Sequence, residues 1–567
     1  MNEVAFSPGP LADRVNKALA AARDENVLER IWSKDASLWK SDEESARIIR
    51  NSLGWLTVAD EMIGVADELN EFADSVRSRG FRHVMVCGMG GSSLCPEVMA
   101  RTFGKQDGHP ELLVLDSTDP DVVAAFASRI DIERCLFVIA SKSGSTTEPN
   151  VFYKYWYDEV SKLRDNPGEN FIAITDPGSP LVETATELKF HRTFLNQPDI
   201  GGRYSALSYF GMVPAALMGL DIRKLLDVAR ISKFVKEGPS VELGVIFGEC
   251  ANAGRNKLTL VIDPSVEALG LWIEQLVAES TGKEGKGILP VNGELLGSPE
   301  VYGDDRLFVS ISVGPIPWDR KARLLDLFGA GHPIIFHEMN EVYDLGAEFL
   351  LWEFATAVAG WRLGINPFDQ PNVQEAKDAT KELLATFERR GHLDPRSEIA
   401  ADEVIMIYGE EVAEAKSIVD VLRAQLATIE PGDYIAFLNY IEETPEIDRQ
   451  FQDLRTQLRD ATKCAVTIGY GPRFLHSTGQ LHKGGANTGV FFQIIANDQR
   501  DFAVPGEPYT FSILKQAQAL GDFRALVKRK RRVIGIDLGN DTRSGLEHLH
   551  KLIVGAALRG RPFSEQA

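Results

Sequence analysis

The chain has 567 residues, too many for a single hydrophobic core, so two to four domains are expected. Hydrophobic residues make up 44% and charged residues 25%, as in ordinary globular proteins, and no run of about 18 apolar residues predicts a membrane span. A net charge of −21 disfavours nucleic acid and anionic membrane as partners. Five scattered cysteines without a CxxC pair disfavour a disulfide framework or structural zinc and fit a reducing cytoplasm.

The first part of the chain predicts helices and then a parallel sheet. Residues 1 to about 75 place apolar residues three and four apart, the period of amphipathic helices. Short apolar runs bounded by turn residues then alternate with helical stretches. These predicted strands are 83–87, 111–116, 135–140 and 171–176. Strands separated by helices imply right-handed βαβ units and a doubly wound parallel sheet.

The alternation recurs twice more, with a long helical stretch predicted over 371–427. Further strands are expected at 257–263, 306–312, 333–338, 433–439, 464–470, 489–496 and 532–539. We predict an α/β protein with domains at 1–225, 226–380 and 381–567, the last being an additional C-terminal α/β lobe. The basic run at 528–532 is expected to be an exposed loop.

A glycine-rich turn, CGMGGSS at 87–93, directly follows the first predicted strand. Such a turn brings backbone N–H groups and a helix N-terminus to an anion, and Gly91 and Ser92 are the candidate contacts. A dinucleotide fingerprint is the competing interpretation, with Asp116 as its acidic residue, but Ser93 stands where that fingerprint needs a third glycine.

A second loop, SKSGSTTEP at 141–149, follows the strand 135–140 and favours a phosphate monoester. Its five hydroxyl groups donate hydrogen bonds and its lysine supplies a cation. A serine- and threonine-rich helix cap explains only one or two of these hydroxyls. The candidate phosphate ligands here are Ser141, Lys142, Ser143 and Thr146.

Together the two loops resemble the sugar isomerase (SIS) domain, whose ligands are phosphosugars. GGRYS at 201–205, EQLVAESTGK at 274–283 and NPFDQPNVQEAK at 366–377 extend the resemblance to phosphoglucose isomerases. The nearest likeness is the isomerase half of bifunctional transaldolase/phosphoglucose isomerases, without a transaldolase half. The resemblance implies two flavodoxin-like SIS domains and interconversion of glucose 6-phosphate and fructose 6-phosphate.

The motifs supply residues for each step of that reaction. Moving a carbonyl from C1 to C2 needs a base that transfers a carbon-bound proton, and Glu279 is the candidate. Arg203 resembles the family arginine that stabilises the enediolate. By resemblance, Gln370 contacts the substrate and Lys377 assists ring opening.

The ring-opening histidine departs from the family order. Between Glu279 and the FDQ motif the chain has only His332 and His337, neither in the family context. The segment FLHSTGQ instead lies at 474–480, so His476 is the candidate and His482 the second choice. We expect this segment to fold back onto the site from the C-terminal lobe.

No metal, nicotinamide or ATP is expected, because the reaction transfers protons and no electrons. The expected partner is a small phosphosugar, with neither nucleic acid nor membrane, and the chain is expected to be a cytoplasmic monomer or homodimer. Three alternatives stay open: an isomerase that also accepts mannose 6-phosphate, a non-catalytic phosphosugar-binding protein, and a nicotinamide-dependent dehydrogenase.

Overall fold

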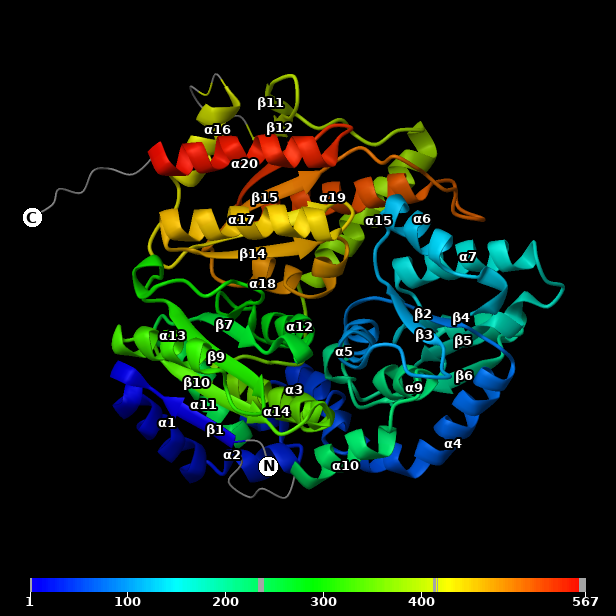
Figure 1. The fold of residues 1–567 in the computed structure, drawn as a ribbon, viewed down its shortest axis with the longest axis horizontal. Coiled ribbons are helices and arrows are strands. Elements are labelled where there is room, and N and C mark those ends of the chain that lie inside the picture. Colours follow the sequence, from blue (N-terminus) through cyan, green and yellow to red (C-terminus); the bar gives the residue numbers. More distant parts are fainter. Residues whose placement is uncertain (1–2, 233–238, 411–414, 416, 560–567) are drawn as a thin grey trace, which may run out of the picture.

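A computed structural model describes residues 3–232, 239–410, 415 and 417–559. Three sheets organise these residues, and Figure 1 shows the first at the right, the second at the lower left and the third above both. The predicted α/β class with parallel sheets is confirmed. The domain boundaries near 225 and 380 stay a prediction.

The first sheet has the strand order of a flavodoxin-like fold. Its strands are β2 (His83–Gly88), β3 (Glu111–Leu115), β4 (Cys135–Ala140), β5 (Phe171–Thr175) and β6 (Arg192–Leu195). All pair in parallel in the order β3-β2-β4-β5-β6, which is 2-1-3-4-5 in chain order. The chain therefore reverses its winding between β2 and β4.

The second sheet repeats this winding and gains an N-terminal strand. It comprises β7 (Lys257–Ile262), β8 (Leu289–Val291), β9 (Arg306–Val313) and β10 (Ile334–Met339), with β1 (Glu3–Ser7) antiparallel to β10. The prediction of helix from residue 1 is therefore wrong at residues 3–7. That strand pairs with a segment more than three hundred residues away, which local periodicity does not reveal.

The third sheet forms the C-terminal lobe. Its strands are β11 (Glu398–Ala401), β12 (Met406–Tyr408), β13 (Tyr434–Tyr440), β14 (Ala465–Tyr470), β15 (Gly489–Ile495) and β16 (Arg532–Asp537), in the order β11-β12-β16-β15-β13-β14. The continuous helix predicted over 371–427 is wrong, because β11 and β12 interrupt it as an antiparallel edge.

Helices cover the faces of all three sheets (Figure 1). They are α1 (Ala12–Asp24), α2 (Val27–Trp32), α3 (Glu43–Arg50), α4 (Val58–Ser78), α5 (Leu94–Phe103), α6 (Pro120–Arg129), α7 (Thr147–Ser161), α8 (Pro180–Glu187), α9 (Tyr209–Leu217), α10 (Ile222–Ser232), α11 (Pro239–Asn252), α12 (Leu269–Thr281), α13 (Trp318–Gly329), α14 (Leu345–Leu363), α15 (Val373–Arg390), α16 (Ile418–Leu426), α17 (Pro445–Thr462), α18 (Gly479–Gly484), α19 (Phe511–Lys528) and α20 (Thr542–Arg559). None of the described helices is long and apolar enough to cross a membrane.

The C-terminal lobe shares a hydrophobic core with the first sheet. Phe152 and Trp156 of α7 belong to one buried cluster with Phe511 and Leu514 of α19. Burial of such aromatic and aliphatic side chains stabilises contact between elements by roughly 1.5–3 kcal/mol per side chain. The lobe is thus packed onto the first sheet, next to the strand ends that carry the predicted phosphate loops.

Candidate active site

Both predicted phosphate loops follow the two strands at which the first sheet reverses its winding. The turn 88–93 follows β2 and the loop 141–146 follows β4, and β2 and β4 are neighbours. In open α/β sheets, the crevice outside the carboxyl ends of such a strand pair is where ligands bind. The topology therefore brings the two predicted loops to one edge of the sheet.

Glycine in the first loop permits close backbone contacts. Gly90 has a φ of +55°, and a Cβ there would lie 2.7 Å from Nε2 of Gln275 and 2.9 Å from the carbonyl oxygen of His476. A Cβ at Gly91 would lie 1.9 Å from the carbonyl oxygen of Gly202. Side chains are excluded at both positions, so the turn lies directly against segments from α12, the Arg203 loop and the C-terminal lobe.

Arg203 is buried with its guanidinium fixed on every side. Its Nε donates to Ser280 Oγ at 2.7 Å, one Nη to Gln370 Oε1 at 2.9 Å, and the other to the carbonyl oxygens of Pro367 and Asp369 at 2.7 and 3.1 Å. The side chain is only 3% exposed. The structure therefore joins the predicted Arg203 and Gln370 directly.

Glu279 lies beside this guanidinium near the end of α12. Its Oε1 is 3.6 Å from Arg203, and its Oε2 accepts a hydrogen bond from Gln275 Nε2 at 3.1 Å. The same Nε2 donates to the carbonyl oxygen of His476 at 2.8 Å. One amide group thus links the carboxylate of α12 to the turn that carries the predicted histidine.

His476 reaches the site from the C-terminal lobe and contacts Glu148 at the start of α7. Its Nε2 is 3.2 Å from Glu148 Oε1. Burial alone raises the pKa of the Glu148 carboxyl, but the His476 ring and Lys377 outweigh it, so this pKa lies below its ordinary value. Lys377, half-buried on α15, is therefore within electrostatic range of the same pair.

His482, the second-choice histidine, has a different environment. Its Nδ1 is 2.9 Å from the Tyr434 hydroxyl, and its ring packs against Phe491. Burial, reinforced by Lys483 and Arg531, holds the pKa of His482 well below its usual range. The two histidines between Glu279 and the FDQ motif also have partners: His337 of β10 pairs with Glu348 of α14, and His332 packs against Phe308.

The predicted phosphate ligands of the second loop lie at the N-terminus of α7. Ser141 Oγ donates to Thr146 Oγ1 at 3.2 Å, while Ser143 is exposed. Lys142 contacts the Asp176 carboxylate and donates to the carbonyl oxygen of Pro198 at 2.8 Å. The Lys142 ammonium is therefore partly neutralised by Asp176. The hydroxyls of Ser141 and Thr146 lie next to each other at the N-terminus of α7. Ser92 lies buried in the first loop.

Lys283 is a site residue that the motifs contain but that we did not predict as functional. It is buried, and its Nζ donates to Asp369 Oδ1 at 2.7 Å. Burial and then the Arg203 charge lower the pKa of Lys283 to about 8, against the opposing effect of Asp369. Gln275 and Glu148 were also missed. Gln275 is one helical turn before Glu279, a spacing visible in the sequence.

Asp116, the acidic residue of the dinucleotide interpretation, has another role. Its two carboxylate oxygens accept hydrogen bonds from Arg473, each at 2.9 Å, and one also accepts from Ser93 Oγ at 3.2 Å. Arg473 starts the short 3-10 turn Arg473–His476. Asp116 thus fixes the first loop and the His476 turn to each other, which disfavours the dehydrogenase alternative.

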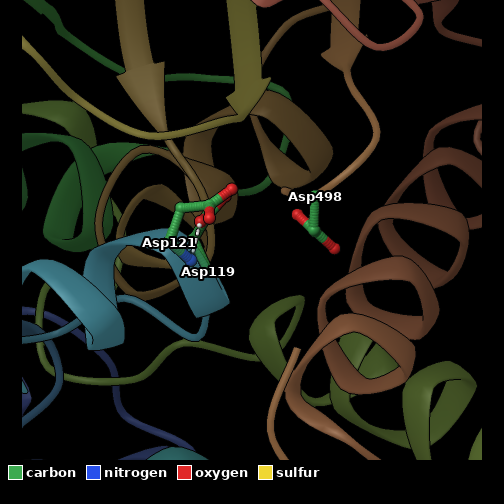
Figure 2. A group of neighbouring side chains, drawn as sticks. All are labelled: Asp119, Asp121 and Asp498. Carbon is green, nitrogen blue, oxygen red and sulfur yellow. Dashed lines mark hydrogen bonds between the residues drawn. The ribbon is translucent and has the colours of Figure 1, made fainter. Parts of the chain in front are cut away.

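Three carboxylates, Asp119, Asp121 and Asp498, lie close together where α6 meets the C-terminal lobe (Figure 2). Lys515 donates to Asp119 at 2.9 Å and also contacts Asp498, while Asp121 accepts from the backbone N–H of Gln499 at 3.0 Å. The Lys515 ammonium thus offsets part of the negative charge of the cluster, and these contacts join the start of α6 to the C-terminal lobe.

The basic run 528–532 is only partly an exposed loop. Arg529 pairs with Glu375, Arg531 donates to the carbonyl oxygen of Gly485 at 2.7 Å, and Arg532 pairs with Asp433 at 2.6 Å. These arginines fasten the end of α19 and the start of β16 to neighbouring elements.

Comparison with known proteins matches residues 51–286 to the family model described as phosphoglucose isomerase. A probable glucose-6-phosphate isomerase of Methanococcus maripaludis is 28% identical over 418 residues, covering 64% of this chain and 93% of that protein. A glucose-6-phosphate isomerase of Rubrobacter xylanophilus is 27% identical, covering 55% of this chain and 84% of its own length.

Solved structures share the fold. A glucose-6-phosphate isomerase from Chlamydia trachomatis superposes with a TM-score of 0.54 and 19% identity, covering 69% of this chain and 90% of that one. A hypothetical protein from Thermus thermophilus superposes with a TM-score of 0.55 and 23% sequence identity, covering 68% of this chain and 100% of that one. The match to the phosphoglucose isomerase family model spans residues 51–286 and includes Arg203 and Glu279, and over these residues the chain is similar to that family.

Proposed function

We propose that the chain interconverts glucose 6-phosphate and fructose 6-phosphate. The observation that carries this proposal is the placement of Gln275, whose single amide nitrogen bonds both Glu279 and the backbone of His476. A base, a fixed guanidinium and a histidine thus meet next to two loops suited to a phosphate. The family match and the relatives support the same activity.

The phosphate would bind at the carboxyl ends of β2 and β4. In the first loop, the candidate phosphate contacts are Gly91 and Ser92. At the N-terminus of α7, whose dipole favours an anion, the candidate hydroxyl donors are Ser141, Ser143 and Thr146. Lys142 adds a cation once it exchanges its contact with Asp176 for the phosphate. Binding through the phosphate then places the sugar carbons toward Glu279.

Ring opening and proton transfer follow from the remaining side chains. His476 donates a proton to the ring oxygen, and Lys377 assists at the C1 hydroxyl. Glu279 then removes the proton at C2 of the aldose and returns it to C1, while the hydroxyl proton moves from O2 to O1, so the Glu279 carboxylate is regenerated in each cycle. Arg203 stabilises the negative charge that develops on the enediolate oxygens, and its fixed hydrogen bonds mean that it needs no reorganisation.

We also propose that one chain supplies the whole site and acts in the cytoplasm. His476 and Glu279 come from the same chain and are linked by Gln275. The M. maripaludis relative matches 64% of this chain across 93% of its own length, so about a third of this chain is additional to it. We further propose that the chain acts on glucose 6-phosphate and not on mannose 6-phosphate.

The test is an assay that couples glucose 6-phosphate formation to a dehydrogenase, run on fructose 6-phosphate and mannose 6-phosphate side by side. Turnover of fructose 6-phosphate alone is expected. Binding of the phosphosugars without turnover would instead identify the non-catalytic alternative, and comparable turnover of mannose 6-phosphate would identify the dual-specificity enzyme.

A further inference from the structure

A chain of buried side-chain hydrogen bonds runs from the loop after β3, through α19, to Glu148 and the proposed ring-opening residue His476. Thr118 Oγ1 donates to Gln518 Oε1 at 2.6 Å, and Gln518 Nε2 donates to Glu148 Oε1 at 2.7 Å. The same Glu148 oxygen is 3.2 Å from His476 Nε2. Thr118 and Gln518 are 0% and 2% exposed, so water cannot replace them freely.

The orientation of the Gln518 amide follows from the charge that it faces. The pKa of Glu148 lies below its ordinary value despite burial, because of His476 and Lys377, so the carboxyl is ionised near neutral pH. An ionised carboxylate accepts hydrogen bonds and cannot donate them. Gln518 must therefore present its NH₂ group to Glu148, and its oxygen then needs the donor that Thr118 provides.

One face of α19 holds this arrangement in place. Lys515, Gln518 and Asp522 are spaced three and four residues apart, which puts them on the same helical face. Lys515 pairs with Asp119 at 2.9 Å, and Asp522 pairs with Lys483 at 2.6 Å. Gln518 thus has a buried ion pair on either side of it along the helix.

We propose that Gln518, oriented by Thr118, is a positioning residue that fixes the Glu148 oxygen to which His476 bonds. This inference rests on the proposed isomerase function. With Glu148 Oε1 fixed as the acceptor for Nε2–H, His476 keeps that proton and donates the proton on Nδ1 to the ring oxygen. Gln518 acts through Glu148, so it is not itself a catalytic residue.

The test compares Gln518→Leu with Gln425→Leu in the full-length protein. Gln425 is also a buried glutamine of the C-terminal lobe, and its Nε2 donates to the carbonyl oxygen of Arg532 at 2.9 Å, away from the proposed site. We expect Gln518→Leu to lower kcat about tenfold, the effect of losing one hydrogen bond to a charged group, with KM changed less than about twofold. Gln425→Leu should leave kcat unchanged.

A double-mutant cycle separates positioning from general destabilisation. If Gln518 acts through His476, Gln518→Leu should cause no further loss of kcat in a His476→Ala background. A kcat that stays within threefold in the single variant would overturn the inference, and so would a full tenfold loss that persists without His476. If Gln518→Leu does not fold, the same cycle is run with Thr118→Val, which removes the hydroxyl donor and leaves the glutamine. Absence of turnover in the unmodified protein would instead overturn the proposed function itself.

Discussion

Arg203 and Glu279 lie 3.6 Å apart yet do not hydrogen-bond to each other. The guanidinium donates to Ser280, Gln370 and two backbone carbonyls, and the carboxylate accepts from Gln275. Arg203 therefore adds positive potential beside Glu279 without occupying the carboxylate in a bidentate pair. A base needs this freedom, because an oxygen held in a bidentate salt bridge is a poor proton acceptor.

Replacing Glu279 by Gln should lower kcat by about 10²–10⁴, the usual contribution of a general base. Binding of glucitol 6-phosphate, an acyclic analogue that cannot react, should persist in calorimetry. Glu284→Gln is the matched control, since Glu284 is an exposed glutamate five residues farther along. Full activity in the Glu279→Gln variant would rule out Glu279 as the general base.

Replacing Arg203 by Lys should lower kcat by about 10²–10³, although the charge is kept. A lysine ammonium cannot reproduce the fixed fork that bonds Ser280, Gln370 and Pro367. The coupled assay measures the loss, and Arg14→Lys, at a residue whose side chain is 51% exposed, serves as control. A loss below threefold would show that charge alone suffices.

Mixing Glu279→Gln and His476→Ala proteins should restore no activity. The structure brings both residues together within one chain through Gln275, so neither variant can complete the other's site. The mixture is assayed after co-incubation and again after joint refolding from denaturant. Recovery toward a quarter of normal activity would mean that the site is shared between subunits.

Replacing Glu274 by Gln should stabilise the protein at pH 8 and not at pH 5. Burial, only partly offset by Arg455 and Arg473, raises the pKa of Glu274 to about 7. The folded state then binds more protons than the unfolded state between the ordinary pKa of 4.5 and about 7, so the wild-type free energy of unfolding falls as pH rises through that window.

The neutral amide of the Glu274→Gln variant has no charge to bury, so this variant should gain about 1–3 kcal/mol of stability above pH 7. Urea titrations at both pH values measure the free energy of unfolding. Glu267→Gln, at an exposed glutamate preceding the same helix, is the control. An equal gain at both pH values would point to a cause other than ionisation.

The five cysteines should stay unreactive in the native protein. All are buried, and burial raises the pKa of each thiol, so little thiolate forms at neutral pH. A thiol-reactive chromogenic disulfide should therefore modify five groups per chain only after unfolding in guanidinium chloride. Rapid labelling of any thiol without denaturant would contradict this expectation.

The longer strands were predictable because each is an apolar run bounded by turn residues, as at β2, β4 and β13. β8 and β12, with three residues each, carry too little pattern to identify. β1 owes its conformation to pairing with β10, the last strand of the second sheet in chain order. Strand pairing of that range is a tertiary effect, which a local window of sequence does not contain.

For the site, the motifs around Arg203, Glu279 and Gln370 predicted residues that the fold does bring into contact. Gln275 could have been found from its one-turn spacing to Glu279. Glu148 and Gln518 could not have been paired, because 370 residues separate them and a buried glutamine on an apolar helix has no distinctive pattern. The partner of Lys142, Asp176, lies only 34 residues away after the neighbouring strand, but the sequence does not show that the two side chains meet.

The hydrogen bonds that Glu148 makes with His476 and Gln518 also have a consequence during synthesis of the protein. Glu148 leaves the ribosome early, whereas its partners follow 328 and 370 residues later. The first two sheets can therefore form around Arg203 and Glu279 while the ring-opening half of the site does not yet exist. A nascent chain would gain its activity late and abruptly, when α19 docks onto α7, and ribosome-bound chains that end before residue 511 would be inactive.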